Sequence, residues 1–276
     1  MKPVFSVEVF PPKIEMGIEH IYGCLEGLSK LNPQFISVTY SAGKGALNNG
    51  LTEKVCKYIQ DKYNINAVAH LTCTNATRQS IKEELDILSS YGISRILALR
   101  GDVTPEKPIL EYQYATDLIE DINKHGDFTV YGACYPEGHQ ESKSFDFDIE
   151  VLKKKYELGV KNFVSQLFFD NDDFTYMLDK AYARGVKDAK FEAGIMPITR
   201  AGQIKRMVEL SGTKITKDVE KIISYQDNES VKKAGVEFAI NQIRDLIARG
   251  VDGIHLYTMD DAVVSTEIYN GIKDLL

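Results

Sequence analysis

The sequence has little of what defines several common protein classes. Its four cysteines form no CxxC pair, and no histidine stands at a zinc-like spacing from them. This pattern argues against a structural zinc site and a disulfide framework. No apolar run reaches the roughly 18 residues that a membrane span needs, and strand-like sequence from Val4 leaves no room for a signal peptide. We therefore expect a cytoplasmic protein with reduced thiols and no membrane partner.

An excess of positive charge is also lacking. The chain has 33 Lys and Arg against 40 Asp and Glu, a formal charge of −7, and its longest basic run is residues 153–155. Because nucleic-acid affinity rests on neutralising phosphates, we expect no nucleic-acid partner. With 43% hydrophobic and 26% charged residues the composition is that of a globular chain, and 276 residues can bury a sizeable core.

Apolar, β-branched runs alternate with amphipathic stretches along the whole chain. Eight strand-then-helix units predict one domain over residues 1–276, a (β/α)₈ barrel of the TIM type. A doubly wound sheet with extra strands is the competing architecture. The long connection from Ser211 to Ser230 predicts an extra helix around Lys217–Tyr225, between strands seven and eight. The expected strands are Val4–Phe10, Phe35–Tyr40, Ala67–Leu71, Arg95–Leu99, Phe128–Cys134, Asn162–Phe168, Phe191–Met196 and Gly253–Tyr257.

Polar side chains stand at the ends of these strands, where a barrel of this type carries its active site. Glu8 lies among apolar neighbours on the same face as Ser6. Desolvation there would favour the protonated carboxyl group and make Glu8 a candidate acid. A structural glutamate paired with a Lys or Arg of a neighbouring strand is the alternative. Together the polar strand ends predict a site; they include Thr39, Tyr40, His70, Thr72, Arg100, Gly101, Asp102, Tyr135, Glu137, His139, Gln166 and His255.

Other polar features are less specific. Gln166 lies inside an apolar run, so its amide must find partners for both the carbonyl and the NH₂ group. No GxGxxG or GxxxxGK motif is present, and the glycine loop at residues 43–45 is a weak phosphate-binding candidate. Asp148 and Lys155 share one face of an expected helix, which without a specified ligand is typical of a solvated rim.

Eight motifs in a fixed order give the chain a family resemblance. Together they resemble the flavin-dependent methylenetetrahydrofolate reductases, from about Phe5 to Thr258. The chain is similar to the short bacterial form, which has the catalytic barrel without a regulatory domain. The motifs are Ser6–Lys13, Ser37–Tyr40, His70–Cys73, Ala98–Asp102, Tyr135–His139, Ser165–Asp170, Gly194–Pro197 and His255–Thr258.

The resemblance implies a barrel that holds FAD non-covalently at its rim, and we expect no metal site. It implies reduction of 5,10-methylenetetrahydrofolate to 5-methyltetrahydrofolate, with hydride from NADH or NADPH passing through FAD in a ping-pong reaction. Glu8 would be the general acid, Asp102 would lie between flavin and pterin, and Gln166 and Gln203 would contact the folate. The implied FAD contacts are Thr39, Tyr40, Ala42, His70, Arg100, Gly101, Asp102, Ala115, Tyr135, His139, Ser142, Asp148 and Lys155.

Two positions depart from the family pattern. Asp261 stands where the family often has an Arg, so the anionic folate tail must be recognised differently. Met207 stands where an aromatic residue can pack on the nicotinamide, which leaves the electron donor open.

Three other functions stay open at this stage. One is a flavin-carrying subunit that receives electrons from a partner protein, and another is a pterin methyltransferase without flavin. A binding protein that has lost activity is the third, although Glu8, Asp102 and Gln166 together argue against it. We also expect a homo-oligomer; most barrels of this type that self-associate do so through helical outer faces.

Overall fold

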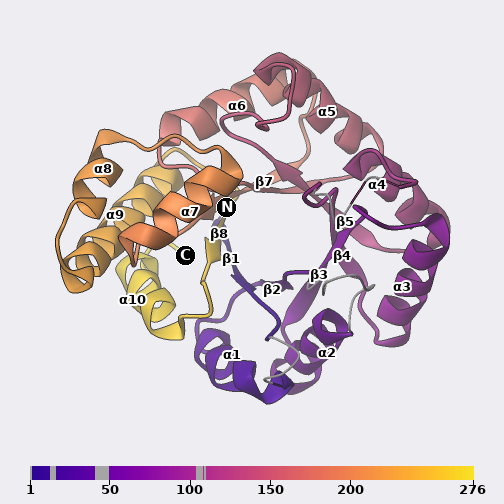
Figure 1. The fold of residues 1–276 in the computed structure, drawn as a ribbon, viewed down its shortest axis with the longest axis horizontal. Helices are drawn as coiled ribbons and strands as arrows, with labels where there is room; N and C mark the ends of the chain where they lie inside the picture. Colours follow the sequence, from indigo (N-terminus) through magenta and orange to yellow (C-terminus); the bar gives the residue numbers. More distant parts are fainter. Residues whose placement is uncertain (1, 13–16, 41–49, 104–107, 109) are drawn as a thin grey trace. The chain divides into compact units, whose positions relative to one another are not determined.

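A computed structural model describes the chain except for residues 1, 13–16, 41–49, 104–107 and 109. In the described residues, eight strands form a closed barrel in sequence order, and a helix follows each strand (Figure 1). This confirms the (β/α)₈ barrel, because a doubly wound sheet is open and has a different strand order. The strands are β1 (Val4–Val9), β2 (Phe35–Val38), β3 (Asn66–Thr72), β4 (Arg95–Leu99), β5 (Thr129–Cys134), β6 (Asn162–Ser165), β7 (Lys190–Ile195) and β8 (Gly253–Tyr257).

The helices alternate with the strands as the amphipathic stretches predict. The helices are η2 (Ile18–Ile21, a 3₁₀ helix), α1 (Tyr22–Ser29), α2 (Leu51–Tyr63), α3 (Arg78–Ser90), α4 (Ala115–His125), α5 (Phe145–Glu157), α6 (Asn171–Ala183), α7 (Ala201–Ser211), α8 (Lys217–Ile223), α9 (Asn228–Ala248) and α10 (Ala262–Ile272). Among the described residues, no helix combines the length and apolar character that crossing a bilayer requires.

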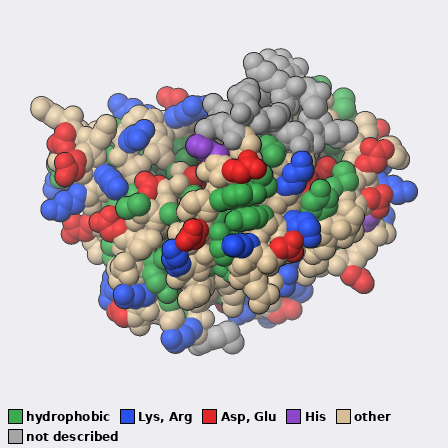
Figure 2. All heavy atoms as spheres, turned by 90° about the horizontal axis from the view of Figure 1, so that it is seen from below, with side chains coloured by type: hydrophobic (Ala, Val, Ile, Leu, Met, Phe, Trp, Pro, Cys, Tyr) green, Lys and Arg blue, Asp and Glu red, His purple; other side chains and the backbone are tan. Residues whose placement is uncertain are grey.

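The chain divides into two compact units. The N-terminal unit comprises Ser6–Ala133 and Lys154–Asn162, and the C-terminal unit comprises Met1–Phe5, Cys134–Lys153 and Phe163–Leu276. On the face drawn in Figure 2, acidic and basic side chains are mixed around a central run of hydrophobic ones. That mixture agrees with the interspersed charges of the sequence.

In the N-terminal unit, parallel pairing sets which side chains stand next to one another. Glu8 of β1 is in register with Ser37 of β2, and His70 of β3 with Leu97 of β4. Because side chains alternate between the two faces of a strand, this register decides which polar groups meet inside the barrel.

In the C-terminal unit, the extra helix expected between strands seven and eight is α8, which ends two residues earlier than the predicted Lys217–Tyr225. Thr216 caps its first turn, with Oγ1 accepting from the Val219 amide at 3.4 Å. Val219 and Ile222 are buried in one apolar cluster with residues of α7 and α9 and of the segments that follow β6 and β7. Burial of these two side chains holds the inserted helix against α7 and α9.

One strand is shorter than its sequence predicts. β6 ends at Ser165, whereas the apolar run predicts a strand as far as Phe168. Leu167, Phe168 and Phe169 are buried, so the run marks core residues beyond the strand. The side-chain Oε1 of Gln166 accepts from the Leu167 amide at 2.8 Å, and such a local bond competes with a regular ladder.

Two carboxyl groups are buried between α2 and α3. Glu53 is 1% exposed and Glu84 is 7% exposed. Burial, followed by the hydrogen bond and the like charge of Glu84, raises the pKa of Glu53 from 4.5 to about 8. A hydrogen bond between two carboxyl groups needs a proton, so the pair is stable only while one member is protonated.

We expect the free energy of unfolding to fall as the pH rises from about 4.5 to about 8. Over this range the folded chain still holds a proton that the unfolded chain has released, so the contribution is complete below pH 4.5 and lost through pH 8. Glu53→Gln keeps a donor for Glu84 but does not titrate, so it should flatten the slope. Denaturant titrations at pH 5 and pH 8.5 measure this. The exposed Glu83→Gln is the matched control and should keep the wild-type slope; an unchanged slope in Glu53→Gln would rule the explanation out.

Candidate active site

Glu8 lies buried at the C-terminal end of β1. Its Oε2 is 3.4 Å from Nε2 of His70 and 3.5 Å from Oγ of Ser37, which donates to it. Glu8 and His70 are each 7% exposed. A buried carboxyl group needs such partners, and here they come from β2 and β3. The structure therefore places a histidine of β3 next to the carboxyl group of Glu8.

The end of β4 carries a tight turn that only glycine fits. Gly101 has a φ of +85°, and a Cβ added there would lie 2.9 Å from Oγ1 of Thr74 and 3.1 Å from Cβ of Thr72. The Thr74 amide donates to the Arg100 carbonyl at 2.8 Å, which joins the loops after β3 and β4. The turn leaves Asp102 exposed and Arg100 half-buried.

The segment after β2 is described only in part. Thr39 and Tyr40 are half-buried, and the Thr39 amide donates to the Val9 carbonyl at 3.0 Å. Thr52 of α2 in turn donates to the Thr39 carbonyl at 3.0 Å, which fixes the end of β2. Ala42 and the glycine loop at residues 43–45 lie outside the described residues.

Lys155 is a buried cation in the N-terminal unit. It is 6% exposed, and its Nζ donates to the Ala133 carbonyl at the end of β5 at 2.7 Å. The sequence favours a solvated rim for Lys155, and the structure instead buries it. Ala115, a further predicted contact in this unit, is the half-buried first residue of α4.

In the C-terminal unit, the loop after β5 brings several predicted residues together. The rings of Tyr135 and His139 pack edge to face at 4.8 Å. The Glu141 amide donates to Nδ1 of His139 at 3.1 Å, so neutral His139 carries its proton on Nε2. The amide of Ser142 donates to the His139 carbonyl at 2.8 Å, and Asp148 lies in the first turn of α5.

In this unit, two glutamine side chains each accept a hydrogen bond from the chain itself at their carbonyl oxygen. Oε1 of Gln166 accepts from the Leu167 amide at 2.8 Å, and Oε1 of Gln203 accepts from the Thr199 hydroxyl at 2.8 Å. Among the described residues, neither Nε2 has a hydrogen-bond partner. Each amide therefore offers its NH₂ group to a ligand as a donor.

Ser165 and Tyr257 hold the backbone next to Gln166, a role that the sequence reasoning missed. Oγ of Ser165 accepts from the Gly194 amide at 2.9 Å and donates to the Gln166 carbonyl at 2.9 Å. The Tyr257 hydroxyl donates to the Ser165 carbonyl at 2.6 Å. The one available signal was Gly194, because a glycine inside a strand indicates a close backbone approach; a Cβ there would lie 2.2 Å from that carbonyl oxygen.

The two departures from the family pattern have structural roles. Oδ1 of Asp261 accepts from the amides of Val263 at 3.1 Å and Val264 at 2.9 Å, which makes Asp261 the N-cap of α10. Met207 of α7 is half-buried and packs against the apolar cluster that includes Leu167.

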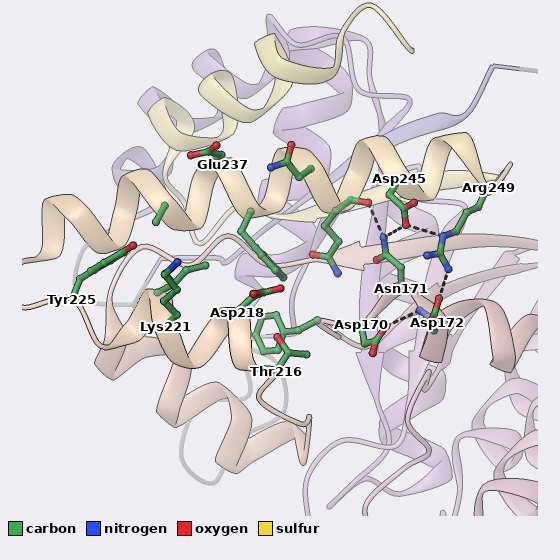
Figure 3. Close-up of a pocket in the computed structure, with 16 residues that line it drawn as sticks. Asp170, Asn171, Asp172, Thr216, Asp218, Lys221, Tyr225, Glu237, Asp245 and Arg249 are labelled. Carbon is green, nitrogen blue, oxygen red and sulfur yellow. Dashed lines mark hydrogen bonds and ion pairs between the residues drawn. The ribbon is translucent and has the colours of Figure 1, made fainter.

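A cavity of about 750 Å³ in the C-terminal unit lies elsewhere, between α8, α9 and the start of α6 (Figure 3). At one end, Arg249 pairs with Asp172 at 2.6 Å and with Asp245 at 2.7 Å, and Asp245 accepts from Nδ2 of Asn171. No predicted site residue lines this cavity. Within the described part of the chain, no three His, Cys, Asp or Glu side chains are grouped to hold a metal ion.

Comparison with known proteins gives the chain its relatives. The family model described as methylenetetrahydrofolate reductase matches residues 1–273. A 5,10-methylenetetrahydrofolate reductase of Pectobacterium carotovorum subsp. carotovorum is 32% identical over 267 residues, covering 95% of this chain and 88% of that protein. The Escherichia coli (strain K12) protein of the same name is 31% identical over 265 residues, with the same coverage.

A solved structure shares the fold. It is an uncharacterized protein from Clostridium thermocellum that binds two copies of 5-methyl-5,6,7,8-tetrahydrofolic acid. Its TM-score is 0.71, with 13% identity, over 100% of this chain and 96% of that one. At this identity the likeness concerns the architecture alone.

We expect Ser165→Ala to lower the free energy of unfolding by about 1–3 kcal/mol, because it leaves the buried Gly194 amide without its acceptor. Denaturant unfolding followed by circular dichroism measures the loss. Ser224→Ala, at an exposed serine that directly follows α8, is the matched control and should change stability by less than about 0.5 kcal/mol. Equal stability of the two variants would contradict the role given to Ser165.

Proposed function

Because the chain belongs to the methylenetetrahydrofolate reductase family, we propose that it reduces 5,10-methylenetetrahydrofolate to 5-methyltetrahydrofolate in a ping-pong reaction. FAD, when bound, supplies the hydride carrier, and NADH or NADPH supplies the electrons. The observation that carries the site assignment is Glu8, a buried carboxyl group at a strand end beside His70 and Ser37.

Three features of the chain fit FAD. The glycine turn at Gly101 brings the backbone close to Thr72, the last residue of β3, and to Thr74 in the loop after it. Lys155 is a buried ammonium group whose position is fixed by Ala133, as suits a charge-assisted bond to a pyrophosphate. Nδ1 of His139 accepts from the Glu141 amide, which puts the proton of the neutral ring on Nε2.

Glu8 is proposed to hold the proton that the reaction consumes. Opening the five-membered ring of the substrate requires protonation of its leaving nitrogen, which gives an electrophilic iminium ion. A carboxyl group among apolar neighbours can carry such a proton. Ser37 fixes Oε2 of Glu8 by hydrogen bonding, and His70 beside it can compensate the charge left after the proton has gone.

Asp102 is proposed to stabilise the iminium cation. It follows the Gly101 turn and is exposed at the end of β4, so its carboxylate is accessible to a ligand. Electrostatic stabilisation of a charge that develops during the reaction is often the largest single contribution to catalysis.

The alternative electron source is a partner protein. Met207 favours a partner protein as the electron source, because the position has no aromatic ring that could stack on a nicotinamide. Anaerobic mixing of the lone, FAD-loaded protein with NADH or NADPH separates the two sources. Bleaching of the flavin absorbance by either nucleotide supports the free donor, and no bleaching by both supports the partner.

Lys155→Met should weaken FAD binding by about 1–3 kcal/mol, or about 5- to 150-fold in Kd, because it removes the charge proposed to meet the pyrophosphate. Fluorescence titration of the apoprotein with FAD measures the change. Lys154→Met is the matched control, because Lys154 is an exposed neighbour on α5. If both variants bind FAD as the wild type does, Lys155 is not a cofactor contact.

Glu8→Gln should separate the two half-reactions. Reduction of the flavin by nicotinamide needs no proton from Glu8 and should stay near the wild-type rate. Folate reduction should slow by about 10²- to 10⁴-fold, because a glutamine cannot supply the proton. Stopped-flow measurement at the flavin absorbance times each half, with the exposed Glu19→Gln as control. A normal folate rate in Glu8→Gln would return Glu8 to a structural role.

A further inference from the structure

The helix that carries Gln203 is anchored at one end. Within α7, Ile204 is the buried residue, and the rest of the helix is half-buried or exposed. The last carbonyls of a helix have no partner inside the helix and need one from elsewhere. Here the carbonyl of Leu210 accepts from Nε2 of Gln140 at 2.6 Å. Gln140 lies on the loop after β5, 70 residues away in the sequence.

Two further bonds hold the residues that follow α7. The Lys214 amide donates to Oε2 of Glu137 at 2.9 Å, and the hydroxyl of Thr213 donates to the Leu167 carbonyl at 3.0 Å. Just before these two residues, Gly212 ends the helix with a φ of +73°, and a Cβ there would lie 3.1 Å from Cβ of Gln140. The end of α7 is thus seated directly on the loops after β5 and β6.

These loops are the ones that carry predicted ligand contacts. Glu137 and Gln140 alternate with Tyr135 and His139 on the loop after β5, and Gln166 precedes Leu167 on the loop after β6. A small cleft is lined jointly by Tyr135, Gln166 and residues 211–213. A movement of α7 would therefore displace both loops, and a movement of either loop would displace the end of α7.

We propose that Gln140 and Glu137 are positioning residues that latch α7 to the loop after β5, so that Gln203 is held for folate by the loop that contacts FAD. The inference rests on the proposed function for what Gln203 and the loop bind. The latch itself is a set of bonds within the C-terminal unit. Breaking it frees the end of α7 and weakens folate binding, while the FAD contacts of Tyr135 and His139 stay in place.

Hydrogen exchange of the purified protein tests the latch without reference to activity. Gln140→Ala and Gln140→Glu remove the donor to Leu210, whereas Gln140→Lys keeps a donor of similar reach. Loss of one such bond should speed amide exchange in residues 201–211 by about 2- to 12-fold. Gln140→Lys should stay within about twofold of wild type, and so should the control Gln226→Ala, an exposed glutamine of the same unit. Unchanged exchange in Gln140→Ala, or equal exchange in the Glu and Lys variants, would overturn the latch.

Steady-state kinetics then test positioning. The KM for methylenetetrahydrofolate should rise about 3- to 10-fold in Gln140→Ala and Gln140→Glu, and Gln140→Lys should restore it, while the FAD Kd changes less than twofold. Faster exchange with an unchanged KM would overturn the positioning role. If the wild-type protein reduced no folate, the proposed function would fail, and the exchange result would still decide the latch.

Discussion

The site in the C-terminal unit depends on one buried hydroxyl. Ser165, fully buried, accepts from the Gly194 amide of β7 and donates to the Gln166 carbonyl, while Tyr257 of β8 donates to its backbone carbonyl. The approach of β7 is so close that a side chain at Gly194 would collide with that carbonyl. These bonds tie the ends of three successive strands together. They also end β6 at Ser165, which places the side chain of Gln166 beyond the strand.

In the N-terminal unit, strand register has the corresponding effect. A carboxyl group on β1 could be buried only where neighbouring strands supply hydrogen-bonding groups at the same level. The register of β1 with β2 puts Ser37 beside Glu8, and β3 brings His70 within 3.4 Å of it. Because a slip of one residue would turn these side chains to the opposite face, the fold of the sheet and the chemistry of Glu8 are set by the same pairing.

The sequence predicts the architecture well because the barrel repeats one local pattern. Eight apolar runs separated by amphipathic stretches are enough to predict the strand order. The unusual length of the connection after Ser211 is enough to predict α8. The strand end at Ser165 is harder, since a buried loop and a buried strand are equally apolar. The bonds from Glu137 and Gln140 to the end of α7 join residues 70 to 77 positions apart, and no local pattern encodes them. The burial of Lys155 is likewise decided by tertiary contacts, because its spacing alone is typical of an exposed helix face.

The orientation of the two glutamines adds a constraint on what this rim can bind. A free amide side chain both donates and accepts, so it tolerates either kind of polar group on a ligand. Here the Leu167 amide and the Thr199 hydroxyl occupy the two carbonyl oxygens, and Gln166 and Gln203 remain as donors. A site with fixed donors discriminates against ligands that lack acceptors at those points, because the donors would then be left unpaired. A heteroaromatic ring with carbonyl and ring-nitrogen acceptors, such as a pterin, satisfies that constraint. In the proposed function, specificity would therefore depend on the groups that hold the glutamines as well as on the glutamines themselves.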